Sequence, residues 1–208
     1  MVVDLVFPII CHQAIPADHG YLVYSALSRL LPDTHQADGF GIHPIAGRQL
    51  DGRTLQLIGA SRLAIRVDAY QIARFLPLAG KPLHLLDRLL RLGVPQIRPL
   101  IPAAALRSRL VTIKLTDAVG MECEAARATF QAAIGRKLQE LEISAAAQAT
   151  LLKRRTVRIR DKEVFGYEVL IEGLAGDESL RLQERGLGGR RHMGCGIFVP
   201  MRALGTGT

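Results

Sequence analysis

A glycine-rich segment near the C-terminus combines residue types that suit phosphate binding. Residues 186–196 contain five glycines, two consecutive arginines and a histidine, and an apolar stretch follows at once. Glycine readily adopts positive φ and can bring backbone N–H groups close to an anion. A guanidinium group can donate two parallel hydrogen bonds to a phosphate. We therefore expect this loop to bind a polyanion. The expected contact residues are Gly188, Gly189, Arg190, Arg191 and His192.

A second basic segment precedes this loop. Residues 153–162 hold six basic side chains, and Val157 and Ile159 alternate with arginines as in a strand. Such a strand can contact RNA, although charge on an exposed strand also protects its edge from aggregation. The overall charge and the neighbouring loop favour RNA contact. The expected contact residues are Arg154, Arg155, Arg158 and Arg160.

Composition narrows the class of partner. The chain of 208 residues has a formal net charge of +8, and residues 105–208 carry 17 basic against 12 acidic side chains. This balance favours nucleic acid or another anionic surface. The three cysteines are far apart and form no CxxC pair, so neither a disulfide framework nor a zinc site is expected. Without a basic leader or an apolar run of about 18 residues, we expect a cytoplasmic protein that does not span a membrane.

Two nucleotide-binding classes do not fit the glycine pattern. No Lys-Ser or Lys-Thr follows the glycines, as a Walker A loop requires, and no GxGxxG follows the first predicted strand. The glycines here enter a strand, whereas a dinucleotide-binding turn leads from a strand into a helix. Nucleotide hydrolysis and nicotinamide binding are therefore disfavoured.

The second half of the chain predicts a βαββαβ order. Asp161 and Lys162 suit the turn of its hairpin, Asp177 suits a helix cap, and Gly186 suits a helix end. This is the split βαβ or ferredoxin-like unit. The predicted elements are a strand at 108–115, a helix at 122–141, a hairpin at 156–174, a helix at 177–185 and a strand at 195–201.

The first half gives the same order with a weaker pattern near its end. We expect an α+β protein of two tandem ferredoxin-like, RRM-like domains, at 1–102 and 103–208, with the glycine-rich loop before the last strand. The predicted elements of the first half are a strand at 2–10, a helix at 18–31, paired strands at 55–58 and 62–67, and a helix at 69–76.

With a basic glycine-rich loop between its last helix and last strand, the chain resembles the CRISPR-associated RAMP superfamily, and within it the Cas6 endoribonucleases. The residues that carry the resemblance are this loop with Phe198, residues 178–184 before it, and the N-terminal segment 18–35. The resemblance implies metal-independent cutting of CRISPR repeats into guide RNAs. The 2′-hydroxyl would attack the adjacent phosphate and leave a cyclic phosphate or 3′-phosphate and a 5′-hydroxyl.

That chemistry needs one group to accept a proton and one to donate a proton, and histidine can do either near pH 7. The family often places such a histidine on or just after the first helix. His35 follows Pro32 and Asp33, where the first helix should stop, so we take it as the principal catalytic candidate, as acid or base. Without the resemblance it would pass for a solvated loop residue. His19, at the start of the helix, is the second candidate. It can contact RNA or merely lie near the helix N-terminus, where the helix dipole disfavours its charged form.

Tyr24 is the third catalytic candidate. Helical periodicity predicts a buried stripe of Leu22, Val23, Ala26, Leu27 and Leu30 and leaves Tyr24 on another face. Its hydroxyl can orient a ribose or phosphate, or can simply lie in water at the rim of the core. The remaining histidines carry less signal, and His43 is expected to be structural. No metal ion and no cofactor is expected.

The partner that the resemblance implies is CRISPR repeat RNA, folded as a stem-loop. Subunits of a CRISPR effector complex are further candidate partners, and the sequence leaves homodimer formation open. Three functions remain: RNA cleavage, a non-catalytic RAMP subunit that holds guide RNA, and an unrelated ribosomal or messenger RNA-binding module. Only cleavage requires a histidine at the site of reaction.

Overall fold

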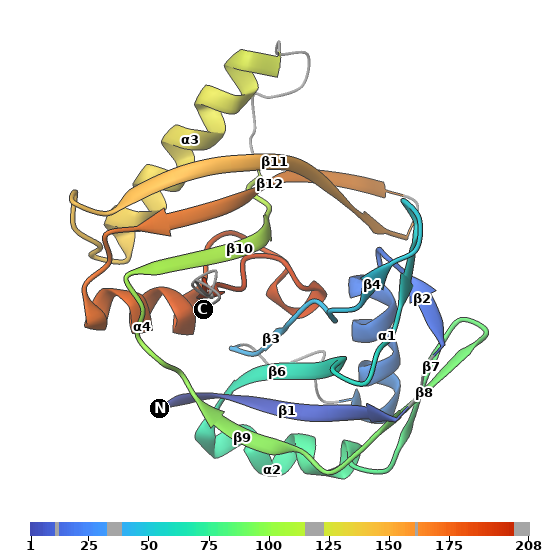
Figure 1. Cartoon of the computed structure of the whole chain (residues 1–208). Coiled ribbons are helices and arrows are strands. Elements are labelled where there is room, and N and C mark those ends of the chain that lie inside the picture. Colours follow the sequence, from blue (N-terminus) through green and yellow to red (C-terminus); the bar gives the residue numbers. More distant parts are fainter. Residues whose placement is uncertain (11–12, 33–38, 115–122, 161, 202–208) are drawn as a thin grey trace, which may run out of the picture. The chain divides into compact units, whose positions relative to one another are not determined.

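The computed structural model describes residues 1–10, 13–32, 39–114, 123–160 and 162–201, and the chain divides into two compact units (Figure 1). The N-terminal unit comprises Met1–Leu100 together with Val157–Val164 and Arg191–Gly194. The C-terminal unit comprises Ile101–Thr156, Phe165–Arg190 and the chain from Cys195 onward. Two short pieces of the second half are therefore counted with the N-terminal unit.

The N-terminal unit is built on β1, which lies at the centre of an antiparallel sheet. One edge of β1 pairs with β6, which also pairs with β3, and the other edge pairs first with β9 and then with β8. The order β9-β1-β6-β3, with α1 and α2 as connections, is the ferredoxin-like topology. The elements are β1 (Val2–Ile10), α1 (Gly20–Leu30), β3 (Gly41–Ile42), β6 (Arg62–Asp68), α2 (Ile72–Phe75) and β9 (Gln96–Pro99).

Two additions extend this unit. A hairpin of β7 (Pro82–Leu85) and β8 (Arg88–Leu92) precedes β9, and a separate sheet has the order β2-β5-β4. Short 3-10 turns flank α2 on both sides. The other bounds are β2 (Ala14–Pro16), β4 (Arg48–Gln49), β5 (Thr54–Gln56), η2 (Ala69–Gln71) and η3 (Leu76–Leu78).

The predicted pairing of residues 55–58 with 62–67 is wrong. β6 pairs with β3, while β5 pairs with β2 and β4. The chain turns between the two strands, where the Ser61 hydroxyl accepts from the Ile58 N–H at 3.0 Å and donates to the Ala46 carbonyl at 2.6 Å. With these hydrogen bonds, the turn does not form the tight β-hairpin that would pair the two strands. β3 is only two residues long, so its sequence carries no strand pattern.

Alternation along β1 separates the two faces of this sheet. Val3, Leu5, Phe7 and Ile9 are buried in the core, and Asp4 belongs to the opposite face. α1 buries Val23, Ala26 and Leu27, as the helical stripe predicted, whereas Leu30 is exposed. Among the helices that the structure describes, none is both long and apolar enough to cross a bilayer.

The C-terminal unit has a four-stranded sheet with the order β11-β12-β10-β13. Its connections again give a βαββαβ order, so the prediction of two tandem ferredoxin-like folds is confirmed. α3 contributes Phe130 and Ile134 to its core, and α4 contributes Leu182. The elements are β10 (Ala105–Val111), α3 (Cys123–Glu140), β11 (Gln148–Ile159), β12 (Lys162–Glu172), α4 (Gly176–Arg185), η4 (Arg191–Met193) and β13 (Val199–Pro200).

Two local predictions for this half need correction. The N-cap of α4 is Ala175 rather than Asp177, because the Glu178 carboxylate reaches back to the Ala175 N–H at 2.8 Å. Strand β11 ends at Ile159, and Arg160 has a φ of 54°, so Arg160 belongs to the turn and does not continue the strand alternation of Arg158.

Candidate functional site

The glycine-rich loop is folded tightly against the end of β10. The Gly189 N–H donates to the Thr112 carbonyl at 3.0 Å, and the Gly196 N–H donates to the Leu110 carbonyl at 2.7 Å. The Gly189 amide that the sequence assigned to an anion is thus bonded to the protein itself. Arg190 has a φ of 63°, a conformation uncommon for a residue with a side chain. The loop has one defined backbone path, which fixes the position from which its side chains project.

Gly188 is the glycine on which that path depends most. Its φ is +76°, and a Cβ added there would lie 2.2 Å from the Thr112 carbonyl oxygen. We expect Gly188→Ala to destabilise the chain by about 1–3 kcal/mol, since left-handed backbone and a backbone clash both oppose alanine. Urea unfolding measures the loss.

Gly189→Ala is the matched control for that substitution. A Cβ at Gly189 would meet nothing within 4 Å, and its φ lies outside the left-handed region. Its stability should stay within about 0.5 kcal/mol of the wild type. Equal losses for the two variants would show that the loop path does not depend on Gly188.

Two predicted site residues that are far apart in sequence meet in the N-terminal unit. The rings of Tyr24, on α1, and His192, on η4, have centroids 4.4 Å apart, and the His192 and Phe40 centroids are 6.4 Å apart. α1 and η4 approach closely because Gly20 has no side chain: a Cβ there would lie 2.1 Å from the Met193 carbonyl oxygen. Tyr24 and His192 therefore form one aromatic cluster.

Arg191 lies beside this cluster on η4. Burial, together with the nearby charge of Arg66, lowers the pKa of Arg191 to about 10. The guanidinium therefore remains protonated at neutral pH. A partly buried arginine of this kind is a strong electrostatic partner for an anion, because water screens it less than it screens an exposed charge.

His19 is held by the backbone through both ring nitrogens. Its Nε2 accepts from the Ile45 N–H at 2.9 Å, and its Nδ1 lies 3.1 Å from the Pro16 carbonyl oxygen. A carbonyl can only accept, so Nδ1 carries the proton and the ring is the neutral tautomer. The side chain is 2% exposed. This geometry favours a structural role for His19 over proton transfer. His35, the principal candidate, lies outside the described residues.

Residues at and just before the start of α1 contact the tip of the β11–β12 hairpin. This hairpin tip, Val157–Val164, belongs to the same compact unit as α1. Asp18 accepts a hydrogen bond from the backbone N–H of Arg158, and the Nε of Arg160 donates to the Tyr21 hydroxyl at 3.1 Å. Both arginine side chains are exposed. These contacts hold two of the predicted RNA-binding arginines beside the helix that carries Tyr24.

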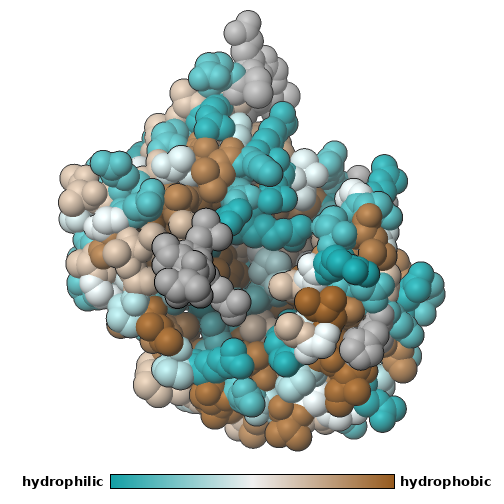
Figure 2. Space-filling view, in the orientation of Figure 1, coloured by the Kyte–Doolittle hydropathy of each residue, from teal (hydrophilic) through white to brown (hydrophobic). Residues whose placement is uncertain are grey.

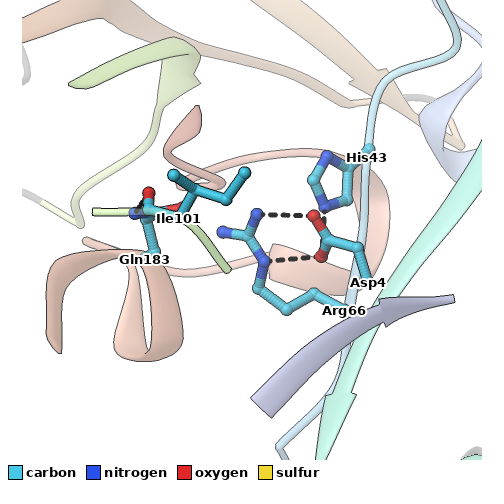
Figure 3. Close-up of polar contacts among 5 residues, drawn as sticks. All are labelled: Asp4, His43, Arg66, Ile101 and Gln183. Carbon is cyan, nitrogen blue, oxygen red and sulfur yellow. Dashed lines mark hydrogen bonds and ion pairs between the residues drawn. The ribbon is translucent and has the colours of Figure 1, made fainter. Parts of the chain in front are cut away.

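A polar cluster that the sequence did not reveal lies on the sheet of β1 and β6, on the face opposite the buried residues Val3, Leu5 and Phe7 (Figure 3). Asp4 and Arg66 lie opposite one another on β1 and β6, and Arg66 donates from Nε at 2.8 Å and from its second terminal nitrogen at 2.9 Å. His43, just after β3, places Nε2 3.0 Å from the same carboxylate. Arg66 is 1% exposed.

The charges of this cluster are mutually dependent. Burial by itself would raise the pKa of Asp4, but hydrogen bonds from His43 and Arg66 outweigh it and hold that pKa well below its ordinary range. Burial lowers the pKa of His43, and the Asp4 carboxylate opposes this only in part. His43 is therefore neutral at pH 7 and donates from Nε2 to Asp4. Asp4 is the lone charged residue in an apolar strand, which is the only sequence signal of the cluster.

The remaining predicted contacts, Arg154 and Arg155, lie on β11 in the C-terminal unit. The Arg154 guanidinium carbon is 4.9 Å from the Phe165 ring centroid, and Arg155 donates to Glu168 at 2.9 and 2.7 Å. Figure 2 shows hydrophilic residues gathered over part of the β11–β12 hairpin. In the described part of the chain, no three His, Cys, Asp or Glu side chains come together as metal ligands would.

Comparison with known proteins places this geometry in a family. The family described as Cas6 CRISPR matches residues 3–203. The chain is 41% identical over 200 residues to the CRISPR-associated endonuclease Cas6 of Myxococcus xanthus (strain DK1622), covering 95% of this chain and 81% of that protein.

Solved structures agree in fold. A CRISPR-associated protein Cas6 has a TM-score of 0.63 at 14% identity and covers 97% of this chain and 99% of its own. A RAMP protein described as binding different RNA substrates also has a TM-score of 0.63, at 12% identity, and covers 97% of this chain and 100% of its own. The chain belongs to the Cas6 family of CRISPR-associated proteins.

Proposed function

We propose that this chain is a metal-independent endoribonuclease that cuts the repeats of precursor CRISPR transcripts and so produces guide RNAs. The observation that carries the proposal is the 41% identity, over 95% of the chain, to a CRISPR-associated endonuclease. The net charge of +8 and the exposed arginines of the hairpin tip support RNA as the substrate.

In the proposed reaction the 2′-hydroxyl beside the scissile phosphate attacks that phosphate. His35 transfers a proton, either from the attacking hydroxyl or to the departing 5′-oxygen. Arg190 and Arg191 provide positive charge near the phosphorane. Tyr24, packed on His192, orients the ribose or phosphate. His19 keeps α1 and Ile45 in place through its two backbone contacts.

The proposed partner is a CRISPR repeat RNA with a stem-loop, met in the cytoplasm. The basic hairpin supplies contacts to the RNA backbone through Arg154, Arg155, Arg158 and Arg160. Subunits of a CRISPR effector complex and a second copy of the chain complete the proposed set of partners. Incubating the protein with its cognate repeat RNA in EDTA tests the function. Protein that binds the RNA and never cuts it would favour a non-catalytic RAMP subunit.

The loop arginines should contribute mainly to binding. We expect the double variant Arg190→Ala/Arg191→Ala to raise the Kd for repeat RNA by on the order of tenfold or more, since two phosphate contacts would be lost. The loss should also reduce the dependence of binding on salt by roughly 0.7–0.9 in log–log slope for each contact. Filter binding at several salt concentrations measures both quantities.

A double variant elsewhere provides the control. Arg88→Ala/Arg91→Ala removes the same charge from two exposed positions on β8. It should weaken binding far less, because these residues lie outside the proposed RNA contacts. Arg190→Ala alone guards against a folding defect caused by removing the partly buried Arg191. Equal losses of RNA affinity in the loop and control variants would show that the loop arginines contribute only general positive charge.

A further inference from the structure

A buried carboxylate on the sheet of the C-terminal unit holds two arginines. Glu168, on the central strand β12, is 1% exposed, and Arg107 and Arg155 come from the strands on either side of it. Arg107 donates from Nε to Glu168 Oε1 at 2.6 Å and also through a terminal nitrogen. Arg155 donates from Nε and a terminal nitrogen to Oε2, at 2.9 and 2.7 Å. Each carboxylate oxygen is thus committed to one guanidinium.

The three residues keep an excess positive charge. Burial raises the pKa of Glu168, but hydrogen bonds from Arg155 and Arg107 outweigh it and lower the pKa, so the carboxylate stays ionised. One negative and two positive charges leave a net charge of about +1. Burying a carboxylate is costly, and pairs of this kind stabilise a fold little by themselves. Their geometry, in contrast, strongly restricts the orientation of the paired groups.

Both guanidinium groups remain accessible. The Arg107 side chain is 50% exposed and the Arg155 side chain is 34% exposed, although the carboxylate between them is buried. Each guanidinium binds Glu168 through one edge, which leaves its other terminal nitrogen as a donor. Among the described residues, no acceptor other than Glu168 is found for either group. Two fixed, half-exposed cations with spare donors are suited to an anion.

The surroundings favour RNA as that anion. Lys153 and Arg154 are exposed on the same strand as Arg155, and guanidinium forks match phosphate oxygens. The sheet is that of a ferredoxin-like unit, a platform that RNA-binding modules also use. We propose that Arg107 and Arg155 bind the phosphodiester backbone of the RNA, and that Glu168 is a positioning residue that orients them. The identity of the ligand rests on the proposed function.

The substitution Glu168→Gln distinguishes two ways in which the arginines could favour RNA binding: through a fixed orientation or through general positive charge. The two predict opposite changes in RNA affinity. The variant has one more positive charge, so charge alone predicts tighter RNA binding. Loss of orientation predicts weaker binding, because glutamine cannot hold two guanidinium groups with one acceptor oxygen. We expect the Kd for fluorescently labelled repeat RNA to rise by on the order of five- to tenfold.

Glu172→Gln is the matched control, since Glu172 lies exposed on the same strand and gives the same change of charge. It should bind RNA as well as the wild type or better.

Arg107→Lys keeps the charge but loses the forked guanidinium group, and should weaken RNA binding with an unchanged salt slope. Arg107→Ala should lower the slope by roughly 0.7. Circular dichroism at each binding temperature confirms folding, and the exposed Arg107 variants decide the case if Glu168→Gln is unfolded.

The outcomes separate this inference from the proposed function. Wild-type protein that does not bind repeat RNA would overturn both. Wild-type protein that binds, with Glu168→Gln binding as tightly as Glu172→Gln and Arg107→Lys as tightly as the wild type, would overturn only the positioned arginine pair. A selective loss in Glu168→Gln and Arg107→Lys supports it.

Discussion

Replacing His35 with alanine should reduce the rate of repeat-RNA cleavage by on the order of 10²-fold or more while the RNA affinity stays unchanged. The reason is chemical: an acid or base that transfers a proton in the transition state contributes typically 10²–10⁴-fold to the rate. Its removal leaves the phosphate contacts of the arginines in place. Single-turnover cleavage and filter binding on the same preparation separate the two effects.

His84→Ala is the control for this prediction. His84 lies exposed on β7, outside the residues assigned to the reaction, and its loss should leave the rate unchanged. A His35→Ala variant that cuts at the wild-type rate would exclude His35 as the proton-transfer group. A variant that loses binding and cleavage together would instead assign His35 to substrate contact.

The second large effect should come from Asp4→Ala, which we expect to lower the free energy of unfolding by about 3–5 kcal/mol. The substitution leaves the guanidinium of Arg66, 1% exposed, without its carboxylate. Breaking a buried ion pair from one side is costly because the remaining charge is uncompensated. Urea unfolding at pH 7 measures the change.

An exposed ion pair gives the comparison. Asp87→Ala removes the partner of Arg88, but the Asp87 side chain is 73% exposed and the Arg88 side chain 45% exposed. Pairs in water contribute at most about 1 kcal/mol. Losses of similar size for Asp4→Ala and Asp87→Ala would show that the Asp4 cluster is not a buried structural pair.

The same cluster predicts how stability depends on pH. His43 has a lowered pKa in the folded state, so the unfolded chain binds more protons, and its contribution decreases as the pH falls below about 6.5. Asp4 also has a lowered pKa, so its contribution is present above about pH 4 and is lost below it. Unfolding free energies of the wild type should therefore decline from pH 7 towards pH 3. In Asp4→Ala the part of the decline below about pH 4 that comes from the Asp4 carboxyl should be absent. The part between about pH 6.5 and pH 4 should be as steep or steeper, because the carboxylate no longer favours the protonated His43 ring. A gentler decline between about pH 6.5 and pH 4 in Asp4→Ala would contradict this assignment.

The topology could be predicted because most elements have a clear pattern. β1 is an apolar run in which Asp4 is the one charged residue, α1 carries an apolar stripe, and α4 ends at Gly186 as predicted. The pairing of β6 could not be predicted, because its partner β3 is two residues long and gives no periodicity. The position of Arg160 in the turn could not be predicted either, since an arginine with a left-handed backbone conformation has no distinctive sequence signal.

Individual residues of the candidate site could be predicted from the sequence, but the clusters that these residues form in the folded chain could not. Tyr24 and His192 were each identified from type and position, yet only the folded chain brings their rings to 4.4 Å. The Asp4 cluster and the Glu168 pair join residues about 60 positions apart across paired strands. A sequence without known strand partners gives no reason to combine them. For the Asp4 cluster, a lone acidic residue in an apolar strand was the available signal, whereas the strand of Glu168 carries two other glutamates and gives no such signal.

The chemistry of the cut ends tests the central claim most directly. Wild-type protein is incubated in EDTA with its cognate repeat RNA, and the termini of both fragments are identified by mass spectrometry. Attack by the 2′-hydroxyl predicts cutting in EDTA, a 2′,3′-cyclic phosphate or 3′-phosphate on the upstream fragment, and a 5′-hydroxyl on the downstream fragment. A 3′-hydroxyl with a 5′-phosphate, or cutting that stops in EDTA, would contradict it.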